Sequence, residues 1–293
     1  MSMFEASIEK IAEFVNTSLD ELLPKPEGPS ARLVEAMRYS VLNGGKRFRA
    51  FLVIRACELS GGKRKQAVHT ACAIECLHAY SLIHDDLPAM DDDDLRRGMP
   101  SCHKKFDEAT AILAGDALLT LAFELVASAP IPGDRIAANV RILAQKAGYQ
   151  GMVGGQMADM LGESAPPNPA LMLNIHEHKT ADLITASVLM GANCGGAPHK
   201  LLEQWQEFGY NCGMAFQVSD DICDSTSTAE EMGKAVGKDK SAGKQTAVAV
   251  LGLAGAQSLA GGYSARAYKS LAFLGARAHD LRDLARWLPK RRK

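Results

Sequence analysis

The sequence lacks the signatures of several common protein classes. Its 293 residues include seven cysteines but no Cys-x-x-Cys pair, so neither a zinc module nor a disulfide framework is indicated. The formal net charge is -1, which argues against the general basic field of a nucleic-acid-binding protein. The P-loop pattern Gly-x-x-x-x-Gly-Lys-[Ser/Thr] is absent. Any affinity for anions must therefore be local.

The sequence also lacks a recognisable leader or membrane span. Met1 to Ile11 carries Glu5 and Glu9 and has neither a basic n-region nor an apolar h-region. No uninterrupted apolar run approaches the roughly 18 residues that suggest a membrane-spanning helix. We therefore expect a cytoplasmic protein whose cysteines are buried free thiols.

What is present is a helical pattern of apolar residues. From Ala67 to Ile83 they recur at three- and four-residue spacing, as on one face of an α-helix, and period-two runs are few. No shift in composition marks a domain boundary, so we predict one all-α domain over residues 1–293. Helix breaks are expected where Gly and Pro cluster: 24–29, 61–62, 130–133, 162–169, 195–198 and 261–262.

A first acidic cluster follows one apolar helical run. Six aspartates lie in the ten residues from Asp85 to Asp94, and two arginines follow at once. A solvated acidic loop is the ordinary interpretation of such a run. However, the preceding helix is too apolar to lie in water, so these carboxylates emerge from the core and should need cations. The contiguous aspartates lack the alternating ligands and central Gly of an EF-hand.

The spacing within this cluster predicts an irregular backbone. Asp85 and Asp91 are six residues apart, about 120° off a common face of a regular helix. Pro88 lies between them and disfavours a regular turn. If both carboxylates serve one metal site, the helix must break near Leu87 to Met90.

A second acidic cluster, Asp220-Asp221-x-x-Asp224, ends another apolar segment. Asp220 and Asp224 are four apart and would project from one helix face about 6 Å apart. Magnesium takes one or two carboxylates per ion and completes its shell with water and substrate phosphate. Two such clusters on opposed helices therefore predict a magnesium site for a diphosphate.

Basic residues could supply the positive half of that site. Gly44 to Arg49 combines a flexible backbone with three cations, and arginine binds phosphate oxygens bidentately. Lysines also follow glycines in Gly233-Lys234 and Gly243-Lys244. Taken alone, these segments could be basic surface turns or solvated loops.

Together these residues resemble the trans-isoprenyl diphosphate synthase family, in particular its bacterial farnesyl diphosphate synthases. The matching segments are Gly44–Arg49, His78–Asp85, Ala114–Asp116, Gly154–Gln156, His178–Thr180, Gln217–Asp224 and Gly243–Thr246. The resemblance implies an isoprenoid-synthase bundle of long helices around a deep central cavity, forming a homodimer. It also implies that isopentenyl diphosphate is condensed with dimethylallyl or geranyl diphosphate to give farnesyl diphosphate.

The resemblance assigns roles to individual residues. About three magnesium ions would be held by Asp85, Asp86, Asp91, Asp220 and Asp224. The allylic diphosphate would be bound by Arg96, Lys179, Lys234 and Lys244. Isopentenyl diphosphate would be bound by Lys46, Arg49, His78 and Arg97. Thr180 and Gln217 would line the place where charge develops, and Tyr80 and Ser81 would form the floor that limits chain length.

Three alternatives remain open at this point. A geranylgeranyl synthase would differ mainly below Tyr80, where a smaller side chain is expected. A terpene cyclase would lack the site for isopentenyl diphosphate, and a non-catalytic partner subunit would have lost carboxylates. The basic end, Lys290 to Lys293, is either a solvated tail or a segment that folds over the diphosphate.

Overall fold

The computed structural model describes residues 3–226 and 243–291. Its first half contains α1 (Met3–Leu22), η1 (Gly28–Ser30), α2 (Ala31–Leu42), α3 (Phe48–Leu59), α4 (Arg64–Asp85), β1 (Leu95–Arg96), β2 (Met99–Pro100), α5 (Cys102–Lys105), α6 (Glu108–Ala127) and α7 (Gly133–Ala147). The second half contains α8 (Met152–Gly162), α9 (Pro169–Ile175), η2 (His176–Ala181), α10 (Asp182–Gly195), α11 (His199–Thr226), α14 (Ala247–Ser270), η3 (Leu271–Ala278), α15 (His279–Trp287) and η4 (Leu288–Lys290).

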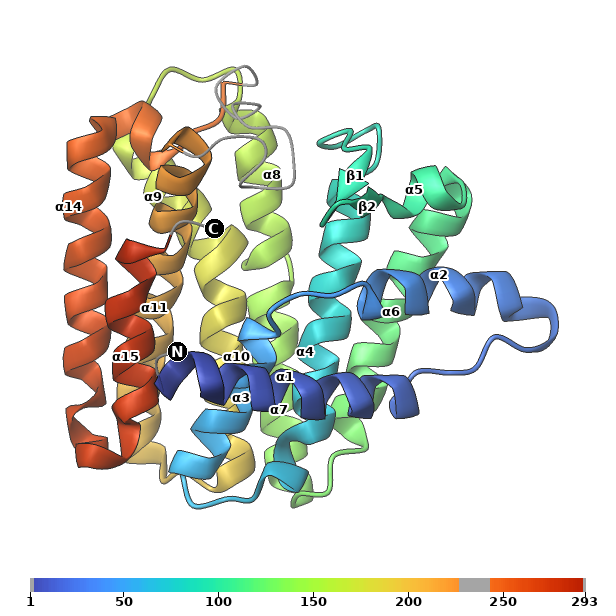
Figure 1. Ribbon diagram of the computed structural model, residues 1–293, viewed down its shortest axis with the longest axis horizontal. Helices are drawn as coiled ribbons and strands as arrows, with labels where there is room; N and C mark the ends of the chain where they lie inside the picture. The colour runs from blue at the N-terminus through green and yellow to red at the C-terminus, as the bar shows by residue number, and fades with distance from the viewer. Residues whose placement is uncertain (1–2, 227–242, 292–293) are drawn as a thin grey trace.

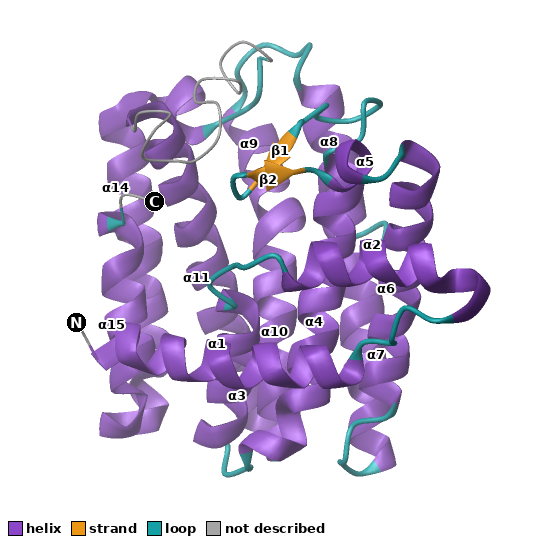
Figure 2. Ribbon diagram, turned by 45° about the vertical axis from the view of Figure 1, so that its right-hand side comes forward, coloured by secondary structure: helices purple, strands orange, loops and turns teal. Residues whose placement is uncertain are grey.

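Long helices run roughly parallel or antiparallel to one another, and α1 and α2 lie across them (Figures 1 and 2). The two short strands form an antiparallel hairpin with Leu95 opposite Pro100 and Arg96 opposite Met99. This hairpin lies at one end of the bundle, directly after α4 (Figure 2). The all-α prediction is confirmed.

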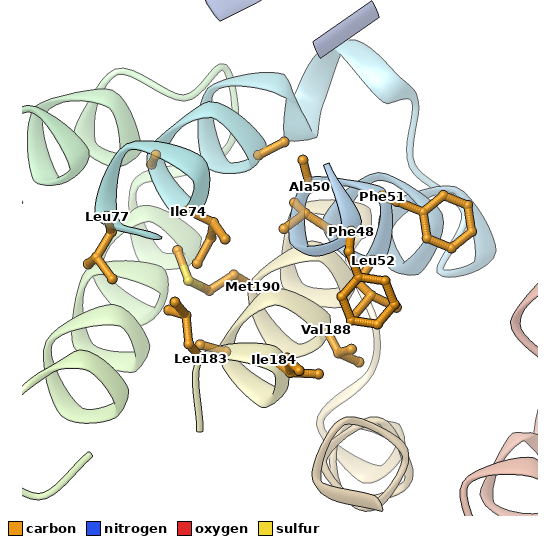
Figure 3. Close-up of a cluster of buried hydrophobic side chains, with 14 of the residues drawn as sticks. Phe48, Ala50, Phe51, Leu52, Ile74, Leu77, Leu183, Ile184, Val188 and Met190 are labelled. Carbon is orange, nitrogen blue, oxygen red and sulfur yellow. The ribbon is translucent and has the colours of Figure 1, made fainter. Parts of the chain in front are cut away.

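The core is built around α10, in which nearly every residue is buried. Figure 3 shows Leu183, Ile184, Val188 and Met190 of this helix facing apolar side chains of α3 and α4. A helix that is apolar all round suits the centre of a bundle. The surrounding helices can therefore bring their polar ends to one common region.

Close packing of α3 on α10 requires a glycine. A Cβ at Gly191 would lie only 2.2 Å from the backbone carbonyl oxygen of Val53, far inside van der Waals contact. Because that atom belongs to the backbone, the whole of α3 would have to move to make room.

Five of the six expected Gly/Pro breaks coincide with connections between helices, but the break at 261–262 is wrong. There α14 continues, and its one residue with non-helical dihedral angles is Gly252 (φ 71°). A Cβ at Gly261 would meet nothing within 4 Å. Gly261 therefore lies in an ordinary helical turn, which composition alone could not reveal.

Among the described residues, α6 is long and apolar enough to match a membrane span by length and composition. The sequence prediction missed this, because Asp116 and Glu124 interrupt its apolar runs. Core helices of globular bundles meet the same criterion, and α6 packs against α4 (Figure 1). Only part of α6 is buried, and Ile112 and Leu113 remain exposed.

We predict that Gly191→Ala destabilises the protein by about 1–3 kcal/mol, the usual cost of overpacking a core. Urea denaturation would measure the change. Gly261→Ala is the matched control and should be neutral or stabilising by up to about 1 kcal/mol, since Ala is the better helix former. Equal effects of the two substitutions would contradict the close-packing argument.

Candidate metal and diphosphate site

The first acidic cluster begins where α4 ends. Asp85 is the last residue of the helix, and irregular turns follow. They fold the chain back on itself, so that the Asp91 amide donates to the Asp85 carbonyl at 2.8 Å and the Asp92 amide donates to the Leu87 carbonyl at 3.2 Å. The predicted break between Leu87 and Met90 is confirmed. It brings the backbone of Asp91 against that of Asp85.

The carboxylates of this cluster have different electrostatic surroundings. Burial raises the pKa of Asp85 to about 6, and the charge of Lys179 offsets this only in part. Burial alone would also raise the pKa of Asp91, but the Lys244 ammonium group, 3.0 Å from Oδ1, lowers it together with Lys179. Asp85 thus carries a negative charge that the described protein does not fully compensate.

The third carboxylate, Asp86, is 2% exposed and is held by the Arg96 guanidinium group through both of its oxygens. Burial still raises the pKa of Asp86. Arg96 lies on β1, so this ion pair anchors the hairpin to the end of α4. A metal or a diphosphate at this position would have to share these groups or exchange their partners.

Lys179 lies in the π-helical segment η2, between α9 and α10. Its ammonium group donates to Asp159 Oδ2 of α8 at 2.6 Å, and the same carboxylate oxygen is 3.9 Å from Lys244 Nζ. A Cβ at Gly155 would lie 2.1 Å from the Lys179 backbone nitrogen, so glycine is needed for this approach. π-helical turns often occur at functional sites.

The second acidic cluster lies on the last turns of α11. Asp220 Oδ1 accepts from the Arg291 guanidinium group at 2.5 Å, and Arg291 also stacks 4.1 Å over the Phe216 ring. The last described residue of the basic tail therefore lies on this cluster. Asp224 follows four residues later on the same helix.

The middle carboxylate, Asp221, points into the protein. It accepts from Gln217 Nε2 at 2.9 Å and from the Ala247 amide at 2.6 Å, and it lies 3.1 Å from His176 Nε2. These contacts join α11 to the start of α14. Asp221 thus fixes the position of the helix that also carries Asp220 and Asp224.

Thr180 and Gln217 are also brought together. The Thr180 hydroxyl donates to Gln217 Oε1 at 2.6 Å, while the amide nitrogen of Gln217 is occupied by Asp221. Both polar groups are thereby fixed in position between the π-helical segment and the second acidic cluster.

The basic residues around the start of α3 make contacts within the protein. Arg47 is 4% exposed and pairs with buried Glu75 at 3.3 Å, so it holds the loop before α3 in place. Arg49 Nη1 lies 3.3 Å from His78 Nε2. Burial lowers the pKa of Arg49 to about 10 and, with the surrounding arginines, lowers the pKa of His78 well below its usual value. His78 is therefore neutral at physiological pH.

The other predicted isopentenyl-binding residues have contacts of their own. Arg97, on the hairpin, donates to the Gly44 carbonyl at 2.6 Å. The Lys46 ammonium group lies 5.6 Å from the centre of the Trp287 ring. Lys234 lies outside the described residues.

The predicted chain-length residues lie one turn before Asp85. The Tyr80 ring is partly buried and packs edge-on against His84, with 5.1 Å between ring centres. Ser81 donates to the His78 carbonyl at 2.9 Å, an ordinary bond within the helix. Of the two, only Tyr80 places bulk beside the neighbouring helix.

Sequence reasoning missed Asp159 and left the placement of Arg291 open. Asp159 follows Gln156 by three residues, within one helical turn of the matched Gly154–Gln156 segment, so the signal was present. Arg291 lies 71 residues from Asp220, and no local pattern predicts that contact.

The donor set fits magnesium. Carboxylate oxygens are the ligands that this ion prefers, and the uncompensated charge of Asp85 favours a bound cation. Lys179 and Lys244 stand beside these carboxylates and could hold the oxygens of a diphosphate. The described residues therefore bring carboxylates that could bind a metal and cations that could bind phosphate into one place.

Comparison with known proteins identifies the family of the chain. Residues 30–268 match the family model described as polyprenyl synthetase. The chain is 46% identical over 245 residues to a geranylgeranyl pyrophosphate synthase of Arabidopsis thaliana, covering 83% of this chain and 65% of that protein. It is 44% identical over 265 residues to the farnesyl diphosphate synthase of Haemophilus influenzae, covering 89% of each.

Among solved structures, it resembles a Helicobacter pylori geranyltransferase complexed with magnesium and isoprenyl diphosphate. The TM-score is 0.87 at 36% identity, over 99% of this chain and 97% of that one. The chain belongs to the polyprenyl synthetase family.

Proposed function

We propose that this protein condenses isopentenyl diphosphate with dimethylallyl or geranyl diphosphate and releases farnesyl diphosphate. The observation that carries this proposal is the convergence of Asp85 and Asp91 with Lys179 and Lys244 at the end of α4. The farnesyl diphosphate synthase relative and the magnesium-complexed geranyltransferase support it.

We assign metal binding to Asp85, Asp91, Asp220 and Asp224. Asp86, which Arg96 holds, is assigned to the same site. Bound magnesium, about three ions, would neutralise the allylic diphosphate as it leaves. Lys179, Lys244 and Arg96 would contact the same leaving group through charge-assisted hydrogen bonds. To do so they exchange their present carboxylate partners for phosphate oxygens.

Isopentenyl diphosphate is assigned to the basic group formed by Lys46, Arg49, His78 and Arg97. Ionisation of the allylic carbon–oxygen bond leaves a carbocation that the isopentenyl double bond attacks. Thr180 and Gln217 hold fixed oxygen dipoles that can stabilise the developing positive charge. The released diphosphate is the proposed acceptor of the proton, because these segments offer no evident side-chain base.

The direct test incubates the purified protein with magnesium, labelled isopentenyl diphosphate and geranyl diphosphate, then sizes the products by chromatography. We expect a fifteen-carbon product that disappears with chelator. Asp220→Asn should lower the rate by roughly 10²-fold or more, as for loss of a transition-state stabiliser, whereas exposed Asp134→Asn should not. Absence of product from the wild-type protein would favour the non-catalytic subunit.

Chain length is a separate part of the proposal. The relatives include both farnesyl and geranylgeranyl synthases, so identity alone does not select fifteen carbons over twenty. We assign the limit to the Tyr80 ring, which fills space one turn before Asp85 and packs on His84. Bulk at this level would stop a growing chain.

Tyr80→Ala should therefore shift the product beyond fifteen carbons when isopentenyl diphosphate is in excess. Tyr149→Ala is the control, because Tyr149 is 82% exposed. An unchanged fifteen-carbon product from Tyr80→Ala would remove this residue as the stop.

The raised pKa of Asp85 predicts how the stability of the metal-free protein depends on pH. The folded-state pKa of Asp85, about 6, lies above its usual value, so protonation of this carboxylate favours the folded protein. This contribution to stability is lost as pH rises from about 4 through 6. Asp85→Asn should stabilise the metal-free protein at pH 7 by up to about 3 kcal/mol, and the gain should vanish near pH 4. Urea denaturation in chelator would measure both.

Asp91→Asn is the matched comparison. Because the pKa of Asp91 is lowered, its ionised form stabilises the fold above its unfolded-state pKa, and this stability is lost as pH falls. Asp91→Asn should accordingly destabilise the protein at pH 7. Loss of stability in both variants would contradict the proposed charge difference.

We also propose a homodimer. Apolar side chains remain exposed on α6, at Ile112 and Leu113, and on α8, at Val153, Met157 and Leu161. The three residues on α8 are four apart and share one helix face. Such stripes suit burial against a second subunit. The single domain and the cytoplasmic location remain predictions.

Two other functions are less well supported. A terpene cyclase would not need the basic group around Arg49 and His78, and a partner subunit would not need both acidic clusters. The long-chain alternative differs only in product length and is addressed by the Tyr80 experiment.

A further inference from the structure

The base of the β1–β2 hairpin carries a group of side chains that prenyl transfer does not use. Asp92 and Asp94 precede the hairpin and His103 follows it. One ligand atom from each of the three lies within 4.8 Å of the others. None of these residues is among the ligands proposed above for magnesium.

The imidazole of His103 has a nitrogen that a bound cation would satisfy. The residue is 7% exposed, and its Nδ1 lies 3.2 Å from the Ser101 hydroxyl. Its Nε2 is buried and has no hydrogen-bond partner. A buried polar atom left without a partner is destabilising. A metal ion at Nε2 would remove this cost.

We propose that Asp92, Asp94 and His103 form a second metal site, selective for zinc or a similar transition metal. One imidazole nitrogen with two carboxylates suits Zn²⁺, whereas magnesium and calcium prefer oxygen ligands alone. Zinc bonds of about 2.0–2.2 Å require the three ligand atoms to move closer together. Asp92 and Asp94 are exposed and can make that movement.

The Lys104 side chain competes with the ion for Asp94. The Lys104 ammonium group lies 2.8 Å from Asp94 Oδ1. Both side chains are exposed, and surface ion pairs of this kind are weak. A divalent ion can therefore displace the lysine.

The position of the site suggests what the ion would do. The Ser101 amide donates to the Asp94 carbonyl at 2.9 Å, so the ligands lie where the hairpin begins and ends. The strands between them carry Arg96, which holds Asp86, and the turn carries Arg97, which binds the Gly44 carbonyl. A bound ion would fasten the base of the hairpin and fix both arginines. This goes beyond the proposed prenyl transfer and requires no substrate.

Cobalt is the probe, because its visible absorption reports nitrogen and oxygen coordination. Co²⁺ would be titrated into the full-length protein in millimolar Mg²⁺ without substrate, and Zn²⁺ would then be added to displace it. We expect one tight equivalent with a visible band. Binding should weaken more than about tenfold in His103→Gln and Asp94→Asn and stay unchanged in His199→Gln, which alters an exposed histidine.

A second measurement keeps the test independent of folding defects. Zn²⁺ should slow tryptic cleavage after Arg97 in the wild-type protein but not in Asp94→Asn, which alters an exposed side chain. Cobalt binding that is equally tight in His103→Gln and Asp94→Asn would overturn the proposal, as would unchanged cleavage. Because no step uses an isoprenoid, neither outcome bears on the proposed prenyl transfer.

Discussion

The candidate site depends on the balance between carboxylates and cations at one end of the helical bundle. Cations of the chain contact the carboxylates: Arg96 holds Asp86, Lys244 holds Asp91, Lys179 holds Asp159 and Arg291 holds Asp220. Charges emerging from an apolar core are costly unless they are paired. The pairing lets the fold form before metal and substrate are bound.

Substrate binding would then be an exchange of partners. A diphosphate with magnesium brings both signs of charge, so the carboxylates can turn to the metal and the lysines to phosphate oxygens. New pairs of opposite charge would then replace the existing ones, which limits the electrostatic cost of opening them. At Asp86 and Asp91 a hydrogen bond from Arg96 or Lys244 opposes the effect of burial on the pKa. At Asp85 the charge of Lys179 offsets burial only in part and the pKa is raised to about 6, so this carboxylate should gain most from an added cation.

Sequence alone predicted those parts of the site that depend on local chemistry. Pro88 and the six-residue spacing of Asp85 and Asp91 implied a broken helix, and the chain does break there. The direction of Asp221 was not predictable, because its partners Ala247 and His176 come from distant segments. Nor could spacing show that Lys46 lies over Trp287 or that Arg291 reaches Asp220. Such contacts depend on how helices pack.

For the fold too, local patterns were predictable and packing contacts were not. Periodicity identified the helices, but it could not show that α14 continues through Gly261, where a Cβ would meet nothing within 4 Å. Nor could it show that α3 packs so closely on α10 that a Cβ at Gly191 would clash with Val53. Two glycines of identical chemistry thus have opposite structural meaning. Only the three-dimensional neighbours distinguish them.

The π-helical segment His176–Ala181 also constrains how this chain can change in length. A π turn accommodates one residue more than an α turn. Deleting one residue there would restore the regular helix and narrow the turn that carries Lys179 and Thr180. Lys179 and Thr180 could then no longer face Asp159 and Gln217 together. The segment can tolerate exchanges of residue type at some positions, but its residue count is fixed by the site.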